Sequence, residues 1–469
     1  MTKGDGAGLR FAFAWRTVAA AERLARLSGR GGSSLPGLLG GRLDPRLLEH
    51  LAGDLQQGSA VVTGTNGKTT TATLLAGVGR RAGLRLAHNA AGANLVSGLI
   101  TSLAVQRAQG ARQFAVLEVD EATVARALPA LRPRLLVVTN FFRDQLDRYG
   151  ELMGVVERVA RGIEASPETE LLLNADDPHV ASLARPDRRV RFFGLRPPAG
   201  WAPRRPAGDA VLCPRCGRPL LYRSVTFAHL GDWACPACGF RRPVPEWEAE
   251  PVRSGRESAL RLREGAGELA SLVRFQLPGL YNAYNAVAAA AAARALGWPA
   301  EAVTRELAEA TPAFGRMERF LARGHPVRLA LVKNPAGFDA VLETLAGEEA
   351  GALILAINDR VADGRDISWL WDVRFEDFRA LLEGSEPLVA SGLRAEEMAL
   401  RLALAGVGRR RIELEPDPER ALERVLARLP DGRPVTLCLT YTALLDVHRR
   451  LSRRYALPAF WERGARRGA

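Results

Sequence analysis

The stretch Val61–Gly79, VVTGTNGKTTTATLLAGVG, joins an apolar run to a glycine-rich loop and then to a helical segment. In such loops the glycines allow backbone N–H groups to converge on phosphate, and the following helix adds the partial positive charge of its N-terminus. Lys68 is expected to reach the terminal phosphates of a nucleotide, and the Thr69 hydroxyl to bind Mg²⁺. The residues predicted to hold ATP are Gly64, Thr65, Asn66, Gly67, Lys68, Thr69 and Thr70.

This spacing departs from the common phosphate-loop pattern, because Val62 stands where the first glycine of that pattern belongs. The alternative is a glycine- and threonine-rich turn that only caps a helix. The order of strand, loop, Gly-Lys-Thr and helix favours nucleotide binding.

Further apolar runs, at 114–119, 135–139 and 170–174, alternate with helical segments and end in polar residues. This alternation predicts a parallel sheet with helices on its faces, which binds ligands at the carboxyl ends of its strands. Glu118 is the candidate metal ligand at one such end. Asp120 and Glu121 can equally be solvated caps of the next helix. At another strand end, Asn174, Asp176 and Asp177 either bind the nucleotide or form a turn.

Four of the five cysteines form two Cys-x-x-Cys pairs, CPRCG and CPACG, separated by eighteen residues. This is the spacing of a zinc ribbon, in which each pair offers two sulfurs to one tetrahedral ion. Four thiolates leave no position for water, so the predicted zinc is structural. The predicted zinc ligands are Cys213, Cys216, Cys235 and Cys238, whereas Cys438 lies in an apolar run and is expected in a core.

The chain has 469 residues, which predicts two or three domains. Its net charge of +13 fits a polyanionic partner, an anionic membrane surface, phosphate-rich substrates or plain arginine bias. No apolar run approaches the ~20 residues that span a bilayer. The segment Leu9–Arg30 is interrupted by Arg16 and continues with helical spacing, so an amphipathic helix is favoured over a signal peptide. A cytoplasmic location is expected.

We predict three regions. Residues 1–45 are an N-terminal helix and a Gly/Ser/Pro connector, and residues 46–320 are an ATP-binding domain with the ribbon inserted at about 205–245. Residues 321–469 are a second α/β domain. In this domain NDRVADGRDISWLWD, Asn358–Asp372, follows a buried strand. Spacing alone favours Asp366 as the N-cap of the segment after it.

Several motifs together resemble the Mur ligases, which join amino acids to peptidoglycan precursors through acyl phosphates. They are TGTNGKTTT, TNFFRDQLDRYGE, LLLNADDP, LYNAYNAVAA, FGRMERF and KNPAG. The ribbon and ADGRDISWLWDVRFE narrow the resemblance to the MurT family, the Mur ligase-like subunits of lipid II isoglutaminyl synthase. The resemblance covers roughly Ala20 to Arg450. It implies a Mur ligase-like ATPase domain with a parallel sheet, followed by a Rossmann-like α/β C-terminal domain.

The resemblance also implies an ATP-dependent carbon–nitrogen ligase that amidates the D-glutamate of the lipid II stem peptide, with ammonia from a GatD-like glutaminase subunit. Glu118 would join Thr69 on Mg²⁺. Asp366 would act on ammonia or complete the catalytic group of the partner, ahead of Asp363 and Asp372, and Trp369 and Trp371 would anchor that partner. Asn282, Asn285 and Arg316 would line the nucleotide cleft.

Two departures from the related motifs are visible. Tyr281 stands where phenylalanine is usual, and LVKNPAG replaces an Asp/His motif of ordinary Mur ligases, which suits a branch that uses ammonia. An ordinary Mur-type amino-acid ligase acting alone is the competing interpretation. A nucleic-acid-binding protein is disfavoured, because the arginines are dispersed and few aromatic residues are interleaved with them.

Overall fold

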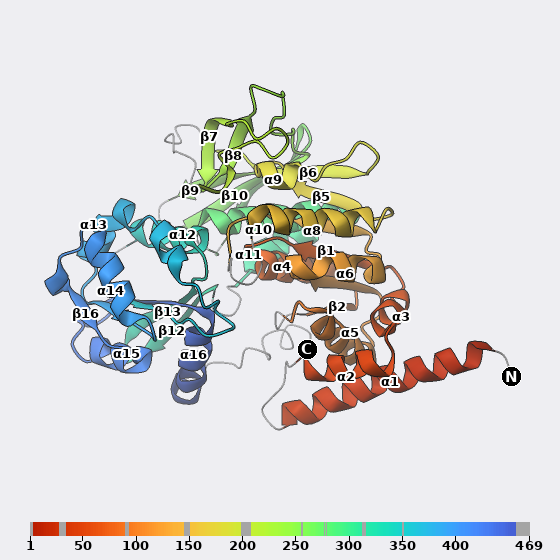
Figure 1. Cartoon of the computed structure of the whole chain (residues 1–469), viewed down its shortest axis with the longest axis horizontal. Coiled ribbons are helices and arrows are strands. Elements are labelled where there is room, and N and C mark those ends of the chain that lie inside the picture. The colour runs from red at the N-terminus through yellow and green to blue at the C-terminus, as the bar shows by residue number, and fades with distance from the viewer. Residues whose placement is uncertain are drawn as a thin grey trace. The chain divides into compact units, whose positions relative to one another are not determined.

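The computed structural model of the chain describes residues 3–27, 34–89, 93–144, 151–197, 208–254, 257–275, 277, 279–311, 316–348 and 351–455. The chain divides into two compact units (Figure 1). The first unit contains residues 1–142 and 153–311, and the second contains residues 143–152 and 312–469.

The first unit is built on a nine-stranded sheet with the strand order β11-β10-β9-β6-β5-β4-β1-β3-β2. From β2 along this order to β9, all neighbouring strands are parallel, as the alternation of apolar runs and helices predicts. At the other edge, β10 is antiparallel to both β9 and β11. The strands are β1 (Ser59–Thr63), β2 (Leu86–His88), β3 (Phe114–Glu118), β4 (Leu135–Val138), β5 (Glu170–Asn174), β6 (Val190–Leu195), β9 (Trp247–Ser254), β10 (Glu257–Glu264) and β11 (Gly267–Arg274).

Helices cover both faces of this sheet. Along the sheet, the connection from β1 to β2 runs in one direction, and those from β2 to β3 and from β3 to β4 run in the other. Because such crossovers are right-handed, α4 lies on one face and α5 and α6 lie on the other. The helices are α1 (Lys3–Leu27), α2 (Leu35–Leu43), α3 (Leu47–Gly53), α4 (Lys68–Arg81), α5 (Val96–Ala108), α6 (Glu121–Leu131), α8 (Leu152–Glu164), α9 (Pro178–Ala181), α10 (Leu280–Ala295) and α11 (Ala300–Glu309).

The ribbon is a small insertion between β6 and β9. It consists of a short 3₁₀ turn, η1 (Gly208–Ala210), and the antiparallel hairpin β7 (Leu221–Phe227) and β8 (Leu230–Ala234). A small core contains Trp233 and Phe240 together with Cys213 and Cys235, and it also includes Ala181 of α9. The two cysteine pairs therefore flank the hairpin, one before β7 and one after β8.

The predicted N-terminal helix is present as α1, but the predicted connector is partly wrong, because its second half forms α2. A Cβ on Gly37 would lie 1.8 Å from the Ser97 carbonyl oxygen, and one on Gly40 would lie 2.3 Å from Val18 Cγ2. These glycines therefore allow close contact with α5 and α1. Packing outweighs the low helix propensity of glycine here.

The second unit is a six-stranded sheet in the order β12-β13-β17-β14-β15-β16, in which all neighbours except β12 and β13 are parallel. Its strands are β12 (Arg316–Ala322), β13 (His325–Leu331), β14 (Ala352–Ala356), β15 (Leu388–Ser391), β16 (Ile412–Leu414) and β17 (Val435–Leu439). Its helices are α12 (Pro335–Ala346), α13 (Arg379–Gly384), α14 (Ala395–Leu404), α15 (Pro418–Leu426) and α16 (Tyr441–Tyr455), with 3₁₀ turns η2 (Ser368–Asp372), η3 (Phe375–Phe378) and η4 (Arg409–Arg411).

These units differ from the predicted regions in two places. The predicted boundary at 320/321 would cut β12, which pairs with β13 in the second sheet. Residues 1–45 are not a separate region, because α1 and α2 pack on α5 of the first unit. Cys438 is buried in β17 as expected, and burial raises the pKa of its thiol to about 12.

Candidate active site and metal centre

The glycine-rich loop after β1 has the backbone conformation of a phosphate-binding turn. Gly64 and Gly67 have φ angles of 120° and 87°, which side-chain-bearing residues rarely adopt. Lys68 is the first residue of α4, and Thr69 follows it partly exposed on the first turn. The loop therefore points the N-terminus of a 14-residue helix at the carboxyl edge of the sheet.

Lys68 is buried, and its ammonium group is held by three oxygens. Nζ donates to the Gly64 carbonyl at 2.6 Å and to Glu121 Oε2 at 2.9 Å, with the Thr65 carbonyl at 3.2 Å. Burial opposes the charge, but Glu121, Asp120 and Glu118 outweigh it and raise the pKa of Lys68 above its usual value. The side chain is thus a fixed positive charge.

The three acidic residues at the end of β3 and directly after it have different roles. Asp120 caps α6 by accepting a hydrogen bond from the Ala122 amide at 3.0 Å, as the capping alternative predicts, but it is a buried cap and not a solvated one. Glu121 is not a solvated cap, because it is buried against Lys68. Glu118 accepts from Asn94 Nδ2 at 3.0 Å through Oε1, while its buried Oε2 accepts no hydrogen bond from any residue that the structure describes.

The donor set near the loop fits Mg²⁺. A buried carboxylate oxygen without a hydrogen-bond donor is a costly arrangement unless a cation compensates it. Glu118 supplies this oxygen at the end of β3, adjacent to β1, and the Thr69 hydroxyl is on the loop that follows β1. Oxygen ligands of this kind are those that Mg²⁺ prefers.

A second segment, to which the sequence analysis gave no role at the site, forms hydrogen bonds with the phosphate loop. It is Thr139–Phe142 at the end of β4, the strand on the other side of β1. The Asn140 side chain forms two hydrogen bonds with the backbone of Asn66, and its carbonyl accepts from the Thr65 amide at 2.8 Å. A Cβ on Gly64 would lie 2.3 Å from Thr139 Oγ1. The signal was the polar pair Thr-Asn directly after an apolar strand.

The N-terminus of α10 contacts the other side of the loop. Asn285 Oδ1 accepts from Thr71 Oγ1 at 3.3 Å, and Asn285 Nδ2 donates to Asn282 Oδ1 at 3.1 Å. A Cβ on Gly67 would lie 2.1 Å from Asn285 Oδ1. The structure thus brings the asparagines of YNAYN to the phosphate loop. Arg316 begins β12 in the second unit, and its place beside the nucleotide stays a prediction.

Asn174 and the two aspartates after it have structural hydrogen bonds. Asn174 is fully buried, donates to the Thr139 carbonyl at 2.8 Å and accepts from the Asp176 amide at 3.0 Å. Asp177 caps α9 and accepts from the Phe141 amide at 2.8 Å. These contacts are those of the turn alternative, and a direct contact between Asn174 and a nucleotide stays a prediction.

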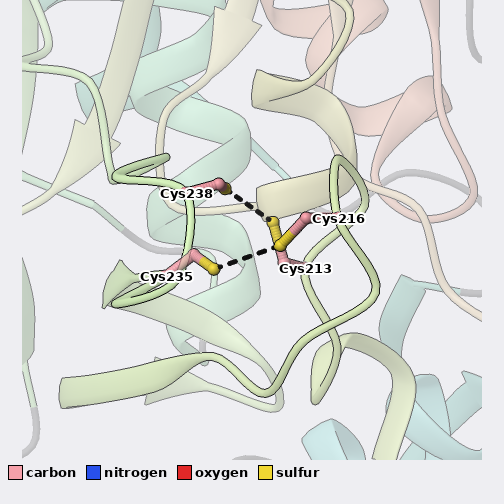
Figure 2. Close-up of side chains that lie close together, drawn as sticks. All are labelled: Cys213, Cys216, Cys235 and Cys238. Carbon is pink, nitrogen blue, oxygen red and sulfur yellow. Dashed lines mark hydrogen bonds between the residues drawn. The ribbon is translucent and has the colours of Figure 1, made fainter.

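The four predicted zinc ligands lie together (Figure 2). Their sulfurs all lie within 4.8 Å of one another, with Cys213–Cys238 at 3.7 Å and Cys216–Cys235 at 3.5 Å. Tetrahedral zinc with Zn–S bonds of about 2.3 Å requires sulfurs about 3.8 Å apart. The cluster therefore fits one tetrahedral metal ion with four thiolate ligands.

The ribbon packs directly on the turn after β5. Trp233 Nε1 donates to the Ala175 carbonyl at 3.2 Å, and Arg242 Nε donates to Asp176 Oδ1 at 2.7 Å. Asp176 also accepts from the Tyr284 hydroxyl of α10 at 2.7 Å. The ribbon is therefore joined through Asp176 to the helix that contacts the phosphate loop.

In the second unit, the turn that contains Asp366 is exposed. Asp366 Oδ1 accepts from the Ser368 amide at 2.8 Å, and hydrogen bonds from Ser368 lower the pKa of this carboxyl. The segment after it is the 3₁₀ turn η2, with Ile367 as its N-cap. Trp371 is 56% exposed, whereas Trp369 packs partly buried against the core.

The other two aspartates proposed for the same role are held differently. Asp363 is buried and bonded to the amide and hydroxyl of Thr442. Asp372 lies 3.3 Å from Arg143. Of the three, Asp366 is therefore the exposed carboxylate that forms no ion pair with a residue in the described parts of the chain.

Comparisons with known proteins identify the family. Residues 62–205 match the Mur ligase middle domain, and residues 331–444 match the MurT ligase C-terminal domain. The chain is 32% identical over 439 residues to the MurT subunit of lipid II isoglutaminyl synthase from Staphylococcus aureus, covering 93% of this chain and 96% of that protein. For the MurT subunit from Streptococcus pneumoniae the identity is 33%, over 92% of this chain and 94% of that protein.

Solved structures show the same fold. A pseudomurein peptide ligase type C from Methanothermus fervidus aligns with a TM-score of 0.65 and 21% identity, over 86% of this chain and 80% of that chain. MurF from Acinetobacter baumannii aligns with a TM-score of 0.60 and 18% identity, over 88% of this chain and 80% of that chain. The fold is thus that of a Mur ligase, and the chain belongs to the MurT family of lipid II isoglutaminyl synthase subunits.

Proposed function

We propose that the chain amidates the D-glutamate carboxyl of the lipid II stem peptide to D-isoglutamine, using ATP, Mg²⁺ and ammonia released from glutamine by a GatD-like glutaminase subunit. The observation that carries this proposal is the fixed Lys68 ammonium at the N-terminus of α4, together with Glu118, whose buried Oε2 accepts no hydrogen bond from the described residues. The arrangement suits transfer of a phosphoryl group, and the names of the MurT relatives supply the substrate class.

The chemistry requires an activated carboxyl group, because hydroxide is a poor leaving group. The γ-phosphoryl group of ATP passes to the carboxylate oxygen, which gives an acyl phosphate and ADP. Ammonia then attacks the carbonyl carbon, and phosphate leaves with the electron pair of the broken C–O bond. Lys68 and the backbone N–H groups of Gly67 and Thr69 would stabilise the negative charge that moves between oxygens.

Mg²⁺ would be held by Thr69 and Glu118 and would neutralise charge on the phosphates. Zinc would be held by Cys213, Cys216, Cys235 and Cys238 and would stabilise the ribbon, which packs on Ala175 and Asp176 at the carboxyl edge of the sheet.

Asp366 would act on the incoming ammonia or complete the catalytic group of the glutaminase. Ammonia reacts only as the neutral amine, so a carboxylate can orient it and accept a proton from the attacking nitrogen. Asp366 is exposed, its lowered pKa keeps it ionised, and Trp371 lies exposed nearby in the chain. A partner that covers Trp371 would gain an aromatic anchor of the kind that often dominates interfaces.

The test is mass spectrometry of lipid II after incubation with the chain, ATP, Mg²⁺ and excess ammonium at mildly alkaline pH. A carboxyl-to-amide mass change that needs ATP and is lost in Lys68→Ala supports the proposal. Glutamine should fail as nitrogen donor until the glutaminase subunit is added. ATP hydrolysis that depends instead on an amino acid, without amidation, would favour an ordinary Mur-type ligase acting alone.

We also propose that the chain works at the cytoplasmic face of the membrane, where a lipid-linked precursor would be reached. Among the described residues, no helix is long and apolar enough to cross a bilayer. Contact with the membrane would therefore be peripheral.

A further inference from the structure

The first two helices carry several large apolar side chains that are exposed. On α1, Leu9, Phe13 and Leu24 are 73%, 63% and 67% exposed. On α2, Leu35, Leu38 and Leu39 are 72%, 49% and 45% exposed. The two helices pack against each other and lie side by side in Figure 1. We call these six residues the α1–α2 apolar surface.

This surface is separate from the face that α1 buries. At 3.6 residues per turn, Leu9, Phe13 and Leu24 fall within an arc of about 60°. Val18 lies on the opposite side of the helix and Ala14 lies about 110° from the centre of this arc, and both are completely buried. The exposed residues are therefore not needed to hold α1 on α2 and α5. A soluble protein rarely leaves so many large apolar side chains together in water without a partner for them.

Where the side chains of α1 and α2 are described, at residues 8–26 and 34–43, the exposed charges are all positive. Arg16 and Arg23 are exposed on the same face of α1 as the apolar residues, and Arg10 is exposed at the border of that face. Arg42 is exposed on the side of α2 that carries Leu35, Leu38 and Leu39, whereas Arg26 is exposed farther round α1. Between residues 8–26 and 34–43, Glu22 is the single carboxylate, and it is buried and paired with Arg26. Arginine interleaved with leucine and phenylalanine suits an interface of anionic headgroups above acyl chains.

We propose that the α1–α2 apolar surface docks the protein onto an anionic lipid bilayer, with α1 lying along the headgroup region. This deepens the proposed function and rests on it for the substrate, because a lipid-linked stem peptide is presented at such a surface. Arg10, Arg16, Arg23 and Arg42 contact lipid phosphates, and Leu9, Phe13 and Leu24 enter the upper acyl region.

The test is co-sedimentation of the chain, alone and in complex with its glutaminase subunit, with vesicles of phosphatidylglycerol and phosphatidylcholine. Wild type should bind vesicles with 30% phosphatidylglycerol at least tenfold more tightly than pure phosphatidylcholine, and binding should weaken as salt is raised. The variant Leu9→Ser/Phe13→Ser/Leu24→Ser should bind at least tenfold more weakly. The variant Arg16→Gln/Arg23→Gln should lose most of the preference for the anionic lipid.

A matched control replaces three leucines of similar exposure elsewhere, Leu221, Leu272 and Leu321, which are 62%, 57% and 70% exposed. The control Leu221→Ser/Leu272→Ser/Leu321→Ser should bind vesicles as wild type does. Equal loss of binding in the control would overturn the assignment to α1 and α2, and so would undiminished binding in the α1 variant. Loss of glutaminase binding in the α1 variant, with vesicle binding retained, would make this surface a protein interface.

Failure of this proposal is distinguishable from failure of the proposed function. The α1 variant should amidate a lipid-free precursor in solution at the wild-type rate, but should amidate lipid II in vesicles at least fivefold more slowly. If both rates match wild type, the surface has no role in substrate access. If neither wild type nor the α1 variant amidates any precursor, but wild type binds anionic vesicles and the variant binds them at least tenfold more weakly, the membrane proposal stands and the amidation proposal fails.

Discussion

Replacing Gly67 by alanine tests whether the phosphate loop depends on its contact with Asn285. The φ angle of Gly67 is 87°, and an added Cβ would lie 2.1 Å from Asn285 Oδ1. Gly83, in the turn after α4, has a φ angle of 86° and open space around the position of a Cβ. Gly67→Ala and Gly83→Ala therefore impose the same backbone strain and differ in the neighbouring side chain.

The left-handed conformation costs alanine about 1–2 kcal/mol, so Gly83→Ala should lower the unfolding free energy by that amount. In Gly67→Ala the buried Asn285 side chain must also move away from Thr71 and Asn282, its hydrogen-bond partners. Two lost hydrogen bonds add about 1–3 kcal/mol. Gly67→Ala should therefore destabilise the chain by about 2–5 kcal/mol.

The same displacement should weaken ATP binding, because the Gly67 amide and the start of α4 surround the predicted phosphate site. If the extra 1–3 kcal/mol is lost from binding, KM for ATP rises by about 5- to 150-fold. Urea titrations followed by circular dichroism give the stabilities, and steady-state kinetics with saturating ammonia and lipid II gives KM. Equal stability and equal KM in the two variants would refute the role of the Asn285 contact.

Three further predictions concern the metal sites and the pH dependence. Glu118→Gln should raise the Mg²⁺ concentration for half-maximal activity about tenfold or more, since it removes a charged oxygen contact; an unchanged Mg²⁺ titration would contradict this. Cys216→Ser should abolish zinc binding, measured by elemental analysis, and lower Tm, whereas Cys438→Ala should keep its zinc. Burial lowers the pKa of His88 to about 4. The unfolded chain therefore binds a proton between about pH 6.5 and pH 4 that the folded chain does not, so acidification through this range should cost about 3 kcal/mol of stability, and His88→Gln should flatten that part of the pH profile.

The sequence by itself determined the features that depend on local spacing. The strand–loop–helix order around Lys68 predicts the phosphate loop, since the conformation of glycine and the end of a helix act within a few residues. The two Cys-x-x-Cys pairs predict the metal cluster for the same reason, because each pair of sulfurs is positioned by one short turn. Parallel strands follow from the alternation of apolar runs with helices.

The tertiary structure alone decided which polar residues meet at the site. Glu121 has the sequence position of a helix cap, but the order β4-β1-β3 brings it to Lys68, 53 residues away in the chain. Asn285 lies against Gly67 although more than two hundred residues separate them. Likewise, the glycines of α2 favour a connector by their local propensity, and the close packing of α2 on α1 and α5 explains why they form a helix. Such contacts depend on strand order and helix packing, which act over distances in the chain that local residue patterns do not encode.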